Sequence, residues 1–375
     1  MQSVTLQCQP GTATATEPSL IRNNPNPAIP IWEQGVSDQD SSGALVPTGC
    51  PPGLLPEHWA ELQASGIAAD VAAANVASFG PGTDRHWETE RAELTHYARL
   101  RIQTESTAGN GHPQAQAGHL SEALARLDRR YRHLSAGGWR TLSATLPGLA
   151  PFDQWKPRTP RHKGKGDPVA GTWRPVLDEH GRPVPIKIET PPQAPDGGGL
   201  FLPNVPEPYW RLICERQGLT FPEDPETIAA GFWPWAIKTR RLELLGAEGP
   251  KKALAAISAG YAAVGIPGAT MGHRGSAETG RRLIAELQAF ACPGRRWRIA
   301  FDADRKPSTA RRVAAAAGAL AQTLRAAGGR VVIARLPLLP GQVKTGVDDL
   351  WASGGAEALD RALGDTAPRA VLPQL

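Results

Sequence analysis

The chain has 375 residues, which is long enough for two ordinary domains with tails, because single hydrophobic cores stop growing below that length. It contains 40 Gly and 36 Pro, so a sizeable part of it is expected in loops and linkers. The four cysteines are far apart and form no C-x-x-C pair, so the sequence suggests neither a zinc ribbon nor a disulfide framework.

The net charge of +5 hides an uneven distribution along the chain. Residues 231–375 carry 21 Lys and Arg against 11 Asp and Glu, whereas the preceding part has an excess of acids. A polyanion would therefore dock on the C-terminal part. Charge alone does not establish this, because many basic domains bind no polyanion.

No stretch approaches eighteen consecutive apolar residues, and the N-terminus lacks the basic and apolar regions of a signal peptide. We therefore expect a cytoplasmic protein that has no membrane partner.

In chain order, residues 1–52 come first and are rich in Pro, Thr, Ser and Asn without apolar periodicity, which predicts a disordered tail. Apolar spacing from Leu55 to Val76 then predicts two short helices broken at Ser65-Gly66, and a further helix is expected over 113–134. Residues 53–235 as a whole are expected to form an irregular α+β region with Pro/Gly-rich loops.

The middle of the chain, roughly 135–230, is predicted to hold short strands such as VPIKIE and GLFLP between long loops. Its stretch WKPRTPRHKGKG places Lys156, Arg158 and Arg161 beside Trp155. Cationic and aromatic side chains together can contact phosphates and stack on bases, so these residues are candidate nucleic-acid contacts. A solvated loop that binds nothing explains the same composition equally well.

From about residue 240, apolar runs of strand length alternate with helical segments, including an alanine-rich helix expected over 309–327. Strands that are apolar nearly throughout and are joined by helices are typical of a mostly parallel sheet covered on both faces. We therefore predict an α/β domain over 236–360 with flanking helices, followed by a tail at 361–375.

Acidic residues follow the predicted strands of this domain, at Glu248, at Asp302 and Asp304, and at Asp348 and Asp349. Functional groups collect at the carboxyl ends of parallel strands. Carboxylates converging there would repel one another, so removing one should not destabilise the metal-free protein, and hard oxygen ligands suit Mg²⁺ or Mn²⁺. The alternative is that the acids cap helices or pair with neighbouring Lys and Arg.

Several motifs together resemble the Toprim-like domain (a domain-of-unknown-function family, DUF3854) of cyanobacterial plasmid replication proteins and related phage and plasmid primases. In the basic part these are EGPKKA from Glu248, SAGYAAVGIPG, FDADRKP and GVDDL. Upstream they are HWAELQASGI, AGGW, WKPRTPR, IKIETPP and GFWPW, so the resemblance covers about residues 54–356.

The resemblance implies a Toprim centre in which Glu248 is the general acid/base and Asp302, Asp304 and Asp348 hold Mg²⁺ or Mn²⁺. Lys251 and Lys252 stand where many Toprim proteins have a further acid, so they could bind a phosphate or replace a metal. Arg295, Arg296 and Arg298 are further candidate nucleic-acid contacts beside the sheet.

The implied function is a Mg²⁺-dependent, primase-like nucleotidyltransferase in plasmid or phage DNA replication, with single-stranded DNA and nucleoside triphosphates as partners. A catalytically silent nucleic-acid-binding module and a Toprim nuclease remain open, because this fold hosts all three. Larger relatives continue into a helicase. This chain has no G-x-x-x-x-G-K-[ST] motif, so we expect no ATP hydrolysis by it. A separate replicative helicase is a candidate partner, and two alternatives stay open: the helicase is encoded separately or has been lost.

Overall fold

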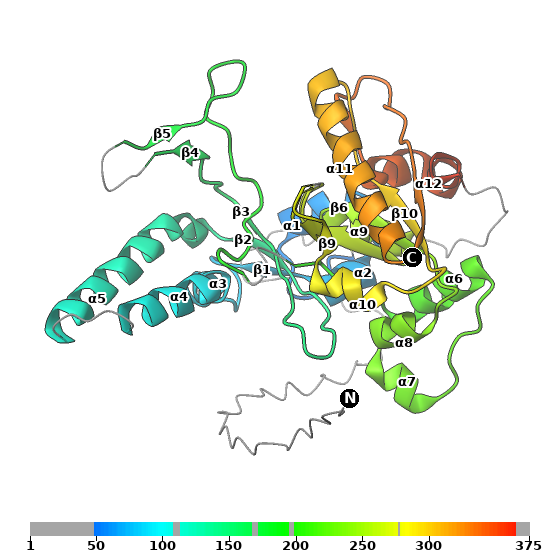
Figure 1. Ribbon diagram of the computed structural model, residues 1–375, viewed down its shortest axis with the longest axis horizontal. Helices are drawn as coiled ribbons and strands as arrows, with labels where there is room; N and C mark the ends of the chain where they lie inside the picture. Colours follow the sequence, from blue (N-terminus) through cyan, green and yellow to red (C-terminus); the bar gives the residue numbers. More distant parts are fainter. Residues whose placement is uncertain (1–48, 108–112, 167–171, 195–198, 277, 365–375) are drawn as a thin grey trace, which may run out of the picture. The chain divides into compact units, whose positions relative to one another are not determined.

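The computed structural model describes residues 49–107, 113–166, 172–194, 199–276 and 278–364 (Figure 1). The predicted tail at 1–52 lies almost entirely outside these residues, as does most of the tail at 361–375. The described part of the chain contains twelve α-helices and a four-stranded parallel sheet flanked by helices, which confirms the predicted α/β class.

The helices before the parallel sheet are α1 (Pro56–Gln63), α2 (Ala69–Asn75), α3 (Trp87–Leu94), α4 (His96–Thr107), α5 (Pro113–Arg130), a 3-10 helix η1 (Arg132–Ala136), α6 (Glu207–Gln217), α7 (Pro225–Ala230) and α8 (Phe232–Lys238). The strands of this part are β1 (Val76–Phe79), β2 (Gly138–Thr141), β3 (Trp155–Pro157), β4 (Gly164–Lys165) and β5 (Arg174–Pro175).

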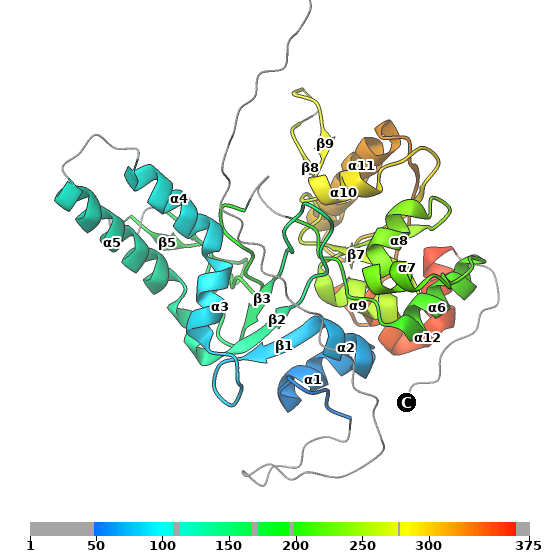
Figure 2. The same cartoon turned by 90° about the horizontal axis from the view of Figure 1, so that it is seen from below.

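The later elements, in chain order, are β6 (Leu244–Glu248), α9 (Pro250–Ser258), β7 (Ala263–Ile266), β8 (His273–Arg274), β9 (Arg282–Leu283), α10 (Ala285–Phe290), β10 (Arg296–Ala300), β11 (Ala303–Asp304), α11 (Pro307–Ala326), β12 (Arg330–Ile333), β13 (Lys344–Thr345) and α12 (Val347–Leu363). The hairpin β8–β9 lies beside α10 and α11 (Figure 2).

The predicted pair of short helices is confirmed, and a tertiary contact adds to the local preference for a break between them. Gly66 has φ +69°, a conformation that favours glycine. Its carbonyl accepts a 2.7 Å hydrogen bond from Trp351 Nε1 of α12, and a side chain at this position would overlap the indole ring. Val76, expected in the second helix, instead begins strand β1, because it pairs with Thr141 of β2.

The strands of the middle region form an antiparallel sheet in the order β1-β2-β3, and β4 pairs with β5 in a separate hairpin. The predicted strands VPIKIE and GLFLP make only isolated bridges in the described residues, through Pro185, Glu189, Phe201 and Pro203. Phe201 bridges Gly265 of β7 and so covers one edge of the parallel sheet.

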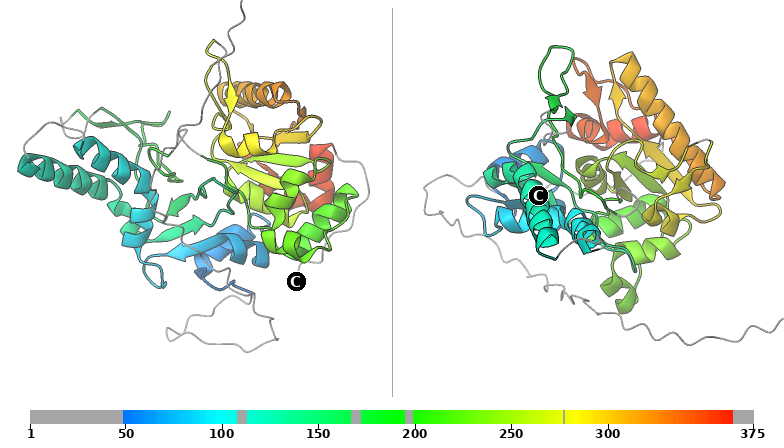
Figure 3. Two further views of the ribbon diagram at one scale, coloured as in Figure 1. Left: turned by 60° about the horizontal axis from the view of Figure 1, so that its bottom comes forward. Right: turned by 60° about the vertical axis from the view of Figure 1, so that its left-hand side comes forward.

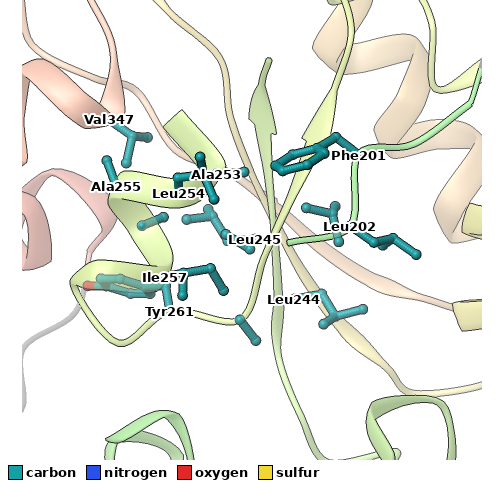
Figure 4. Close-up of a cluster of buried hydrophobic side chains, with 14 of the residues drawn as sticks. Phe201, Leu202, Leu244, Leu245, Ala253, Leu254, Ala255, Ile257, Tyr261 and Val347 are labelled. Carbon is teal, nitrogen blue, oxygen red and sulfur yellow. The ribbon is translucent and has the colours of Figure 1, made fainter. Parts of the chain in front are cut away.

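All neighbours in the four-stranded sheet are parallel, in the order β12-β10-β6-β7. Side chains alternate between the two faces of each strand. On one face Leu245 of β6 lies beside Ala253, Leu254 and Ile257 of α9 (Figure 4). On the other, the ring of Trp297 in β10 lies 6.5 Å from that of Phe290 in α10. Helices lie around the sheet in both views of Figure 3.

One hydrophobic core runs from Leu54 to Leu363 and joins the middle region to the parallel sheet. Aromatic rings contribute strongly, for example Trp210 of α6 against Phe232 and Trp235 of α8. The predicted boundary at 235/236 stays a prediction, since the two sides share this core. Among the described helices, none has the length and apolar character needed to cross a bilayer.

Candidate functional site

Three acidic side chains converge at the carboxyl edge of the parallel sheet. Strands β6 and β10 are neighbours in register at Ala247 and Ala300, so Glu248 and Asp302 leave the sheet next to each other. Asp348 joins them from the first turn of α12. We call Glu248, Asp302 and Asp348 the acidic centre.

The acidic centre is buried but incompletely hydrogen-bonded. Asp302 is 3% exposed and Asp348 7% exposed, and Glu248 is half-buried. Glu248 Oε2, Asp302 Oδ1 and Asp348 Oδ1 have no hydrogen-bond partner among the residues that the structure describes. Leaving buried polar oxygens without partners costs free energy, so such atoms are expected where a ligand completes a site.

Gly346, directly before α12, borders the space between two of these carboxylates. A Cβ atom at this position would lie 2.6 Å from Asp348 Oδ1 and 2.9 Å from Asp302 Oδ1. Any residue can adopt its φ of −106°. Glycine is needed here because a side chain would collide with its neighbours. The two unpartnered oxygens therefore lie near one common point beside Gly346, and Lys252 Cε lies 2.5 Å from the same Cβ position.

Two lysines supply positive charge to the acidic centre. Lys252 of α9 places Nζ 3.3 Å from Asp302 Oδ2, and Lys344 of β13 places Nζ 2.6 Å from the same oxygen. The sequence pointed to Lys252 but not to Lys344. The motif GVDDL begins at Gly346, two residues after Lys344, and only the antiparallel pairing of β13 with β11 brings this lysine to the site.

Burial and neighbouring charges shift proton affinities in the centre. Burial raises the pKa of Glu248, and the charge of Asp302 raises it further against the opposing effect of Lys344 and Lys252. Burial also raises the pKa of Asp348. For Lys252 burial acts in the lowering direction, but Asp302 and Asp348 outweigh it and the pKa is raised. Glu248 therefore holds a proton more readily than an ordinary glutamate, as a general acid/base requires.

Asp304 has a different environment from the acidic centre. Its Oδ1 accepts a 2.8 Å hydrogen bond from the backbone N–H of Lys306, the residue that precedes α11. This contact shapes the turn from β11 into α11. A role for Asp304 as a metal ligand stays a prediction.

The fit of this site to a divalent cation is partial. Unpartnered carboxylate oxygens are suitable ligands for Mg²⁺, and those of Asp302 and Asp348 lie near one common point. However, no group of three or more His, Cys, Asp or Glu side chains in the described ranges is arranged to hold a metal ion. Lys252 and Lys344 supply part of the positive charge that a metal would bring.

Lys251 is directed away from the acidic centre and toward α1. Its Nζ lies 3.2 Å from Glu61 Oε1 and donates a 2.9 Å hydrogen bond to Ser65 Oγ. Glu61 also forms an ion pair with Lys156 of β3. Lys251 and Lys156, which were predicted to bind phosphate and nucleic acid, thus share the carboxylate of Glu61. These ion pairs connect α1 to both α9 and β3.

The other predicted contacts of the middle region are also engaged within the protein. Arg158 pairs with Glu57, and Arg161 Nε lies 2.7 Å from Glu189 Oε1. Trp155 is buried and its Nε1 donates to Glu90. Exposed cationic side chains of this segment include Arg158, Lys163 and Lys165. Trp173, on the β4–β5 hairpin, is an exposed aromatic residue that follows the segment.

Arg295 is fully buried. Its guanidinium donates to the backbone carbonyls of residues 236, 237, 239 and 242, where it satisfies the C-terminal end of α8. We assign it no nucleic-acid contact. Arg296 and Arg298 both lie beside Glu243, and Arg296 is the exposed one of the pair.

Residues 232–358 match the family model described as a domain of unknown function (DUF3854). Over 333 residues the chain is 29% identical to an uncharacterised protein of the cyanobacterium Picosynechococcus sp., and the match covers 85% of this chain. The chain spans 28% of the length of that relative. No solved structure matches the chain. The matched family segment contains all three residues of the acidic centre.

Proposed function

We propose that residues 232–358 form a Toprim-type catalytic domain and that the chain is a primase-like enzyme. It would transfer nucleotides from nucleoside triphosphates to a primer on single-stranded DNA during plasmid or phage replication. The observation that carries this proposal is the acidic centre. Two buried carboxylates and a half-buried one, each with an unpartnered oxygen, lie at the carboxyl edge of a parallel sheet, and two lysines lie among them.

In this proposal Glu248 accepts the proton of the attacking primer hydroxyl, the hydroxyl oxygen bonds to the α-phosphorus of the triphosphate, and pyrophosphate leaves. Its raised pKa brings it closer to neutral pH, where a general base is most effective. Lys252 fixes the orientation of Asp302 through the ion pair at 3.3 Å. The loops at the sheet edge then position the hydroxyl and the triphosphate for reaction.

Asp302 and Asp348 are the residues that would hold Mg²⁺ or Mn²⁺. A cation there would bind triphosphate oxygens and neutralise charge that develops on the transferred group. Asp302 is held ready for this role because its backbone follows a central strand, β10, and its carboxylate is almost completely shielded from water.

The test is primer synthesis by the purified full chain on single-stranded DNA with labelled nucleoside triphosphates and Mg²⁺ or Mn²⁺. We expect metal-dependent synthesis by the parent, none by Glu248→Gln, and parent-like synthesis by Glu357→Gln. Glu357 is a matched control, because it is an exposed glutamate of α12 that pairs with Arg361. Absence of synthesis by the parent under all these conditions would exclude the primase proposal.

One observation favours a second candidate, a nucleic-acid-binding module without catalysis. Two lysines already surround Asp302, so charge compensation in the centre does not depend entirely on a metal. In that case millimolar Mn²⁺ would leave the melting temperature unchanged while single-stranded DNA still binds. Metal-dependent cleavage of a labelled strand in the same assay would instead identify a Toprim nuclease.

A further inference from the structure

The two lysines that contact Asp302 differ in the exposure of their side chains. Lys252 has 19% of its side chain exposed, and the backbone of Gly346 approaches it closely. Lys344 has 49% of its side chain exposed. The ammonium of Lys344 is reached by water although the carboxylate of Asp302 is 1% exposed. Lys344 can therefore turn to another anion while Lys252, which is more enclosed, stays as the counter-ion of Asp302.

The backbone that carries Lys344 is anchored although its ammonium is accessible. The backbone of Lys344 lies opposite that of Asp304, where β13 pairs with β11. The next residue, Thr345, is fully buried, and its Oγ1 accepts a 2.9 Å hydrogen bond from Leu339 N. Gly346 N then donates a 2.7 Å hydrogen bond to Asp349 Oδ2. Lys344 therefore presents a half-exposed charge from a defined point at the mouth of the acidic centre.

Two cationic side chains at this mouth, Lys344 and Arg312, are accessible to an anion with several oxygens. Asp302 is contacted by two ammonium groups, so it keeps one of them when the other turns away. Lys344 and Arg312 both act on Glu248, and Arg312 is an exposed residue of α11. An anion that binds Lys344 would leave the buried pair of Lys252 and Asp302 intact.

We propose that Lys344 is the phosphate-binding residue of the acidic centre. It holds Asp302 in the ligand-free protein and turns to a phosphate group when a polyphosphate, such as the triphosphate of a nucleotide, enters. This assignment deepens the proposed function, because it names the residue that would receive the substrate's phosphates. Exchange of one anionic partner for another keeps Lys344 paired in both states and frees Asp302 Oδ2.

The direct test measures binding of inorganic tripolyphosphate to the full chain in EDTA, by calorimetry and by the shift in melting temperature. We expect the parent to bind and Lys344→Met to bind about ten- to one-hundred-fold more weakly, since a hydrogen bond to a charged group is lost. Lys344→Arg should retain binding because arginine also pairs with phosphate. Each shift is taken from that variant's own ligand-free value, so differences in stability do not enter.

Two further measurements separate a binding role from a structural one. Lys306→Met is the matched control. Lys306 is an exposed lysine beside the same loop, and its ammonium pairs with Glu179. The Lys306→Met variant should bind tripolyphosphate as the parent does. Mn²⁺ should still stabilise Lys344→Met, and by at least as much as the parent, because the ammonium no longer competes for Asp302. A purely structural Lys344 would impair both ligands together.

Parent-like binding of tripolyphosphate by Lys344→Met would overturn the assignment, as would failure of the parent to bind it. Neither result depends on primer synthesis. If binding requires Lys344 but the parent synthesises no primer, the inference stands and the enzyme proposal fails. If the parent synthesises primers and Lys344→Met binds tripolyphosphate normally, only the inference fails.

Discussion

Two buried clusters of charge in this molecule satisfy their hydrogen bonds to different extents. In the antiparallel sheet of the middle region, Arg140 of β2 donates to Glu90 at 3.0 Å and to Asp153 at 2.5 Å. Trp155 Nε1 and Arg85 also donate to Glu90, and Ser143 N donates to Asp153. Both carboxylates of this cluster have partners on both oxygens.

The acidic centre has comparable burial but lacks that saturation. Asp302 Oδ1, Asp348 Oδ1 and Glu248 Oε2 have no hydrogen-bond partner within the described part of the chain. A saturated buried network holds elements together, whereas an unsaturated one leaves capacity for a ligand. The contrast supports a structural role for the Arg140 cluster and is the basis of the functional role proposed for the acidic centre.

The largest effect is expected at the saturated cluster. Arg140→Met removes the cation shared by Glu90 and Asp153 and leaves both acids buried without it, which should lower the free energy of unfolding by about 3–5 kcal/mol. Urea denaturation measures this. Arg361→Ala, which breaks an exposed pair with Glu357, should cost less than about 1 kcal/mol. Similar losses in both variants would refute the structural role of Arg140.

Asp302→Asn tests the unsaturated centre and should have an intermediate effect. The sequence analysis expects repulsion among the carboxylates, and on that basis this change should not destabilise the metal-free protein. The two lysines around Asp302 reverse that expectation, because Lys252 would lose its closest partner. We expect a loss of about 1–3 kcal/mol in EDTA and no stabilisation by Mn²⁺. A variant at least as stable as the parent would show that repulsion dominates.

Glu248→Gln tests the acidic centre through the pH dependence of the melting temperature. The folded protein raises the pKa of Glu248 above its ordinary value of 4.5, so the fold disfavours the charged form. The contribution of this group to stability is therefore lost as pH rises from 4.5 through the raised value. In EDTA the melting temperature of the parent should fall more steeply than that of Glu248→Gln across this window. Parallel curves would indicate that Glu248 titrates normally.

The smallest effect is expected for Asp304→Asn. Its side chain accepts one hydrogen bond from Lys306 N at the turn into α11, and asparagine can accept the same bond. Stability should change by less than about 0.5 kcal/mol, and Mn²⁺ should stabilise this variant as it does the parent. Loss of the Mn²⁺ effect would place Asp304 among the ligands and extend the centre beyond three residues.

The sequence by itself determined the α/β class, the break at Ser65-Gly66 and the alanine-rich helix, which spans Pro307–Ala326. These features follow from periodicity and from residues with strong local preferences. The placement of Glu248 and Asp302 at strand ends was also predictable, because each follows an apolar run. The helix expected over 113–134 ends at Arg130 and is followed by a 3-10 turn, so its end was predictable only approximately.

Only the tertiary structure decided which charges meet. Lys344 reaches Asp302 because β13 pairs with β11, and Lys251 turns to Glu61 because α1 packs nearby. Arginine and tryptophan are residue types that can contact nucleic acid, but Arg295 and Trp155 are both buried. Arg295 donates to backbone carbonyls, and Trp155 donates to Glu90. Strand order and long-range packing set these partnerships. Local sequence patterns carry no information about which distant residue will occupy the neighbouring position.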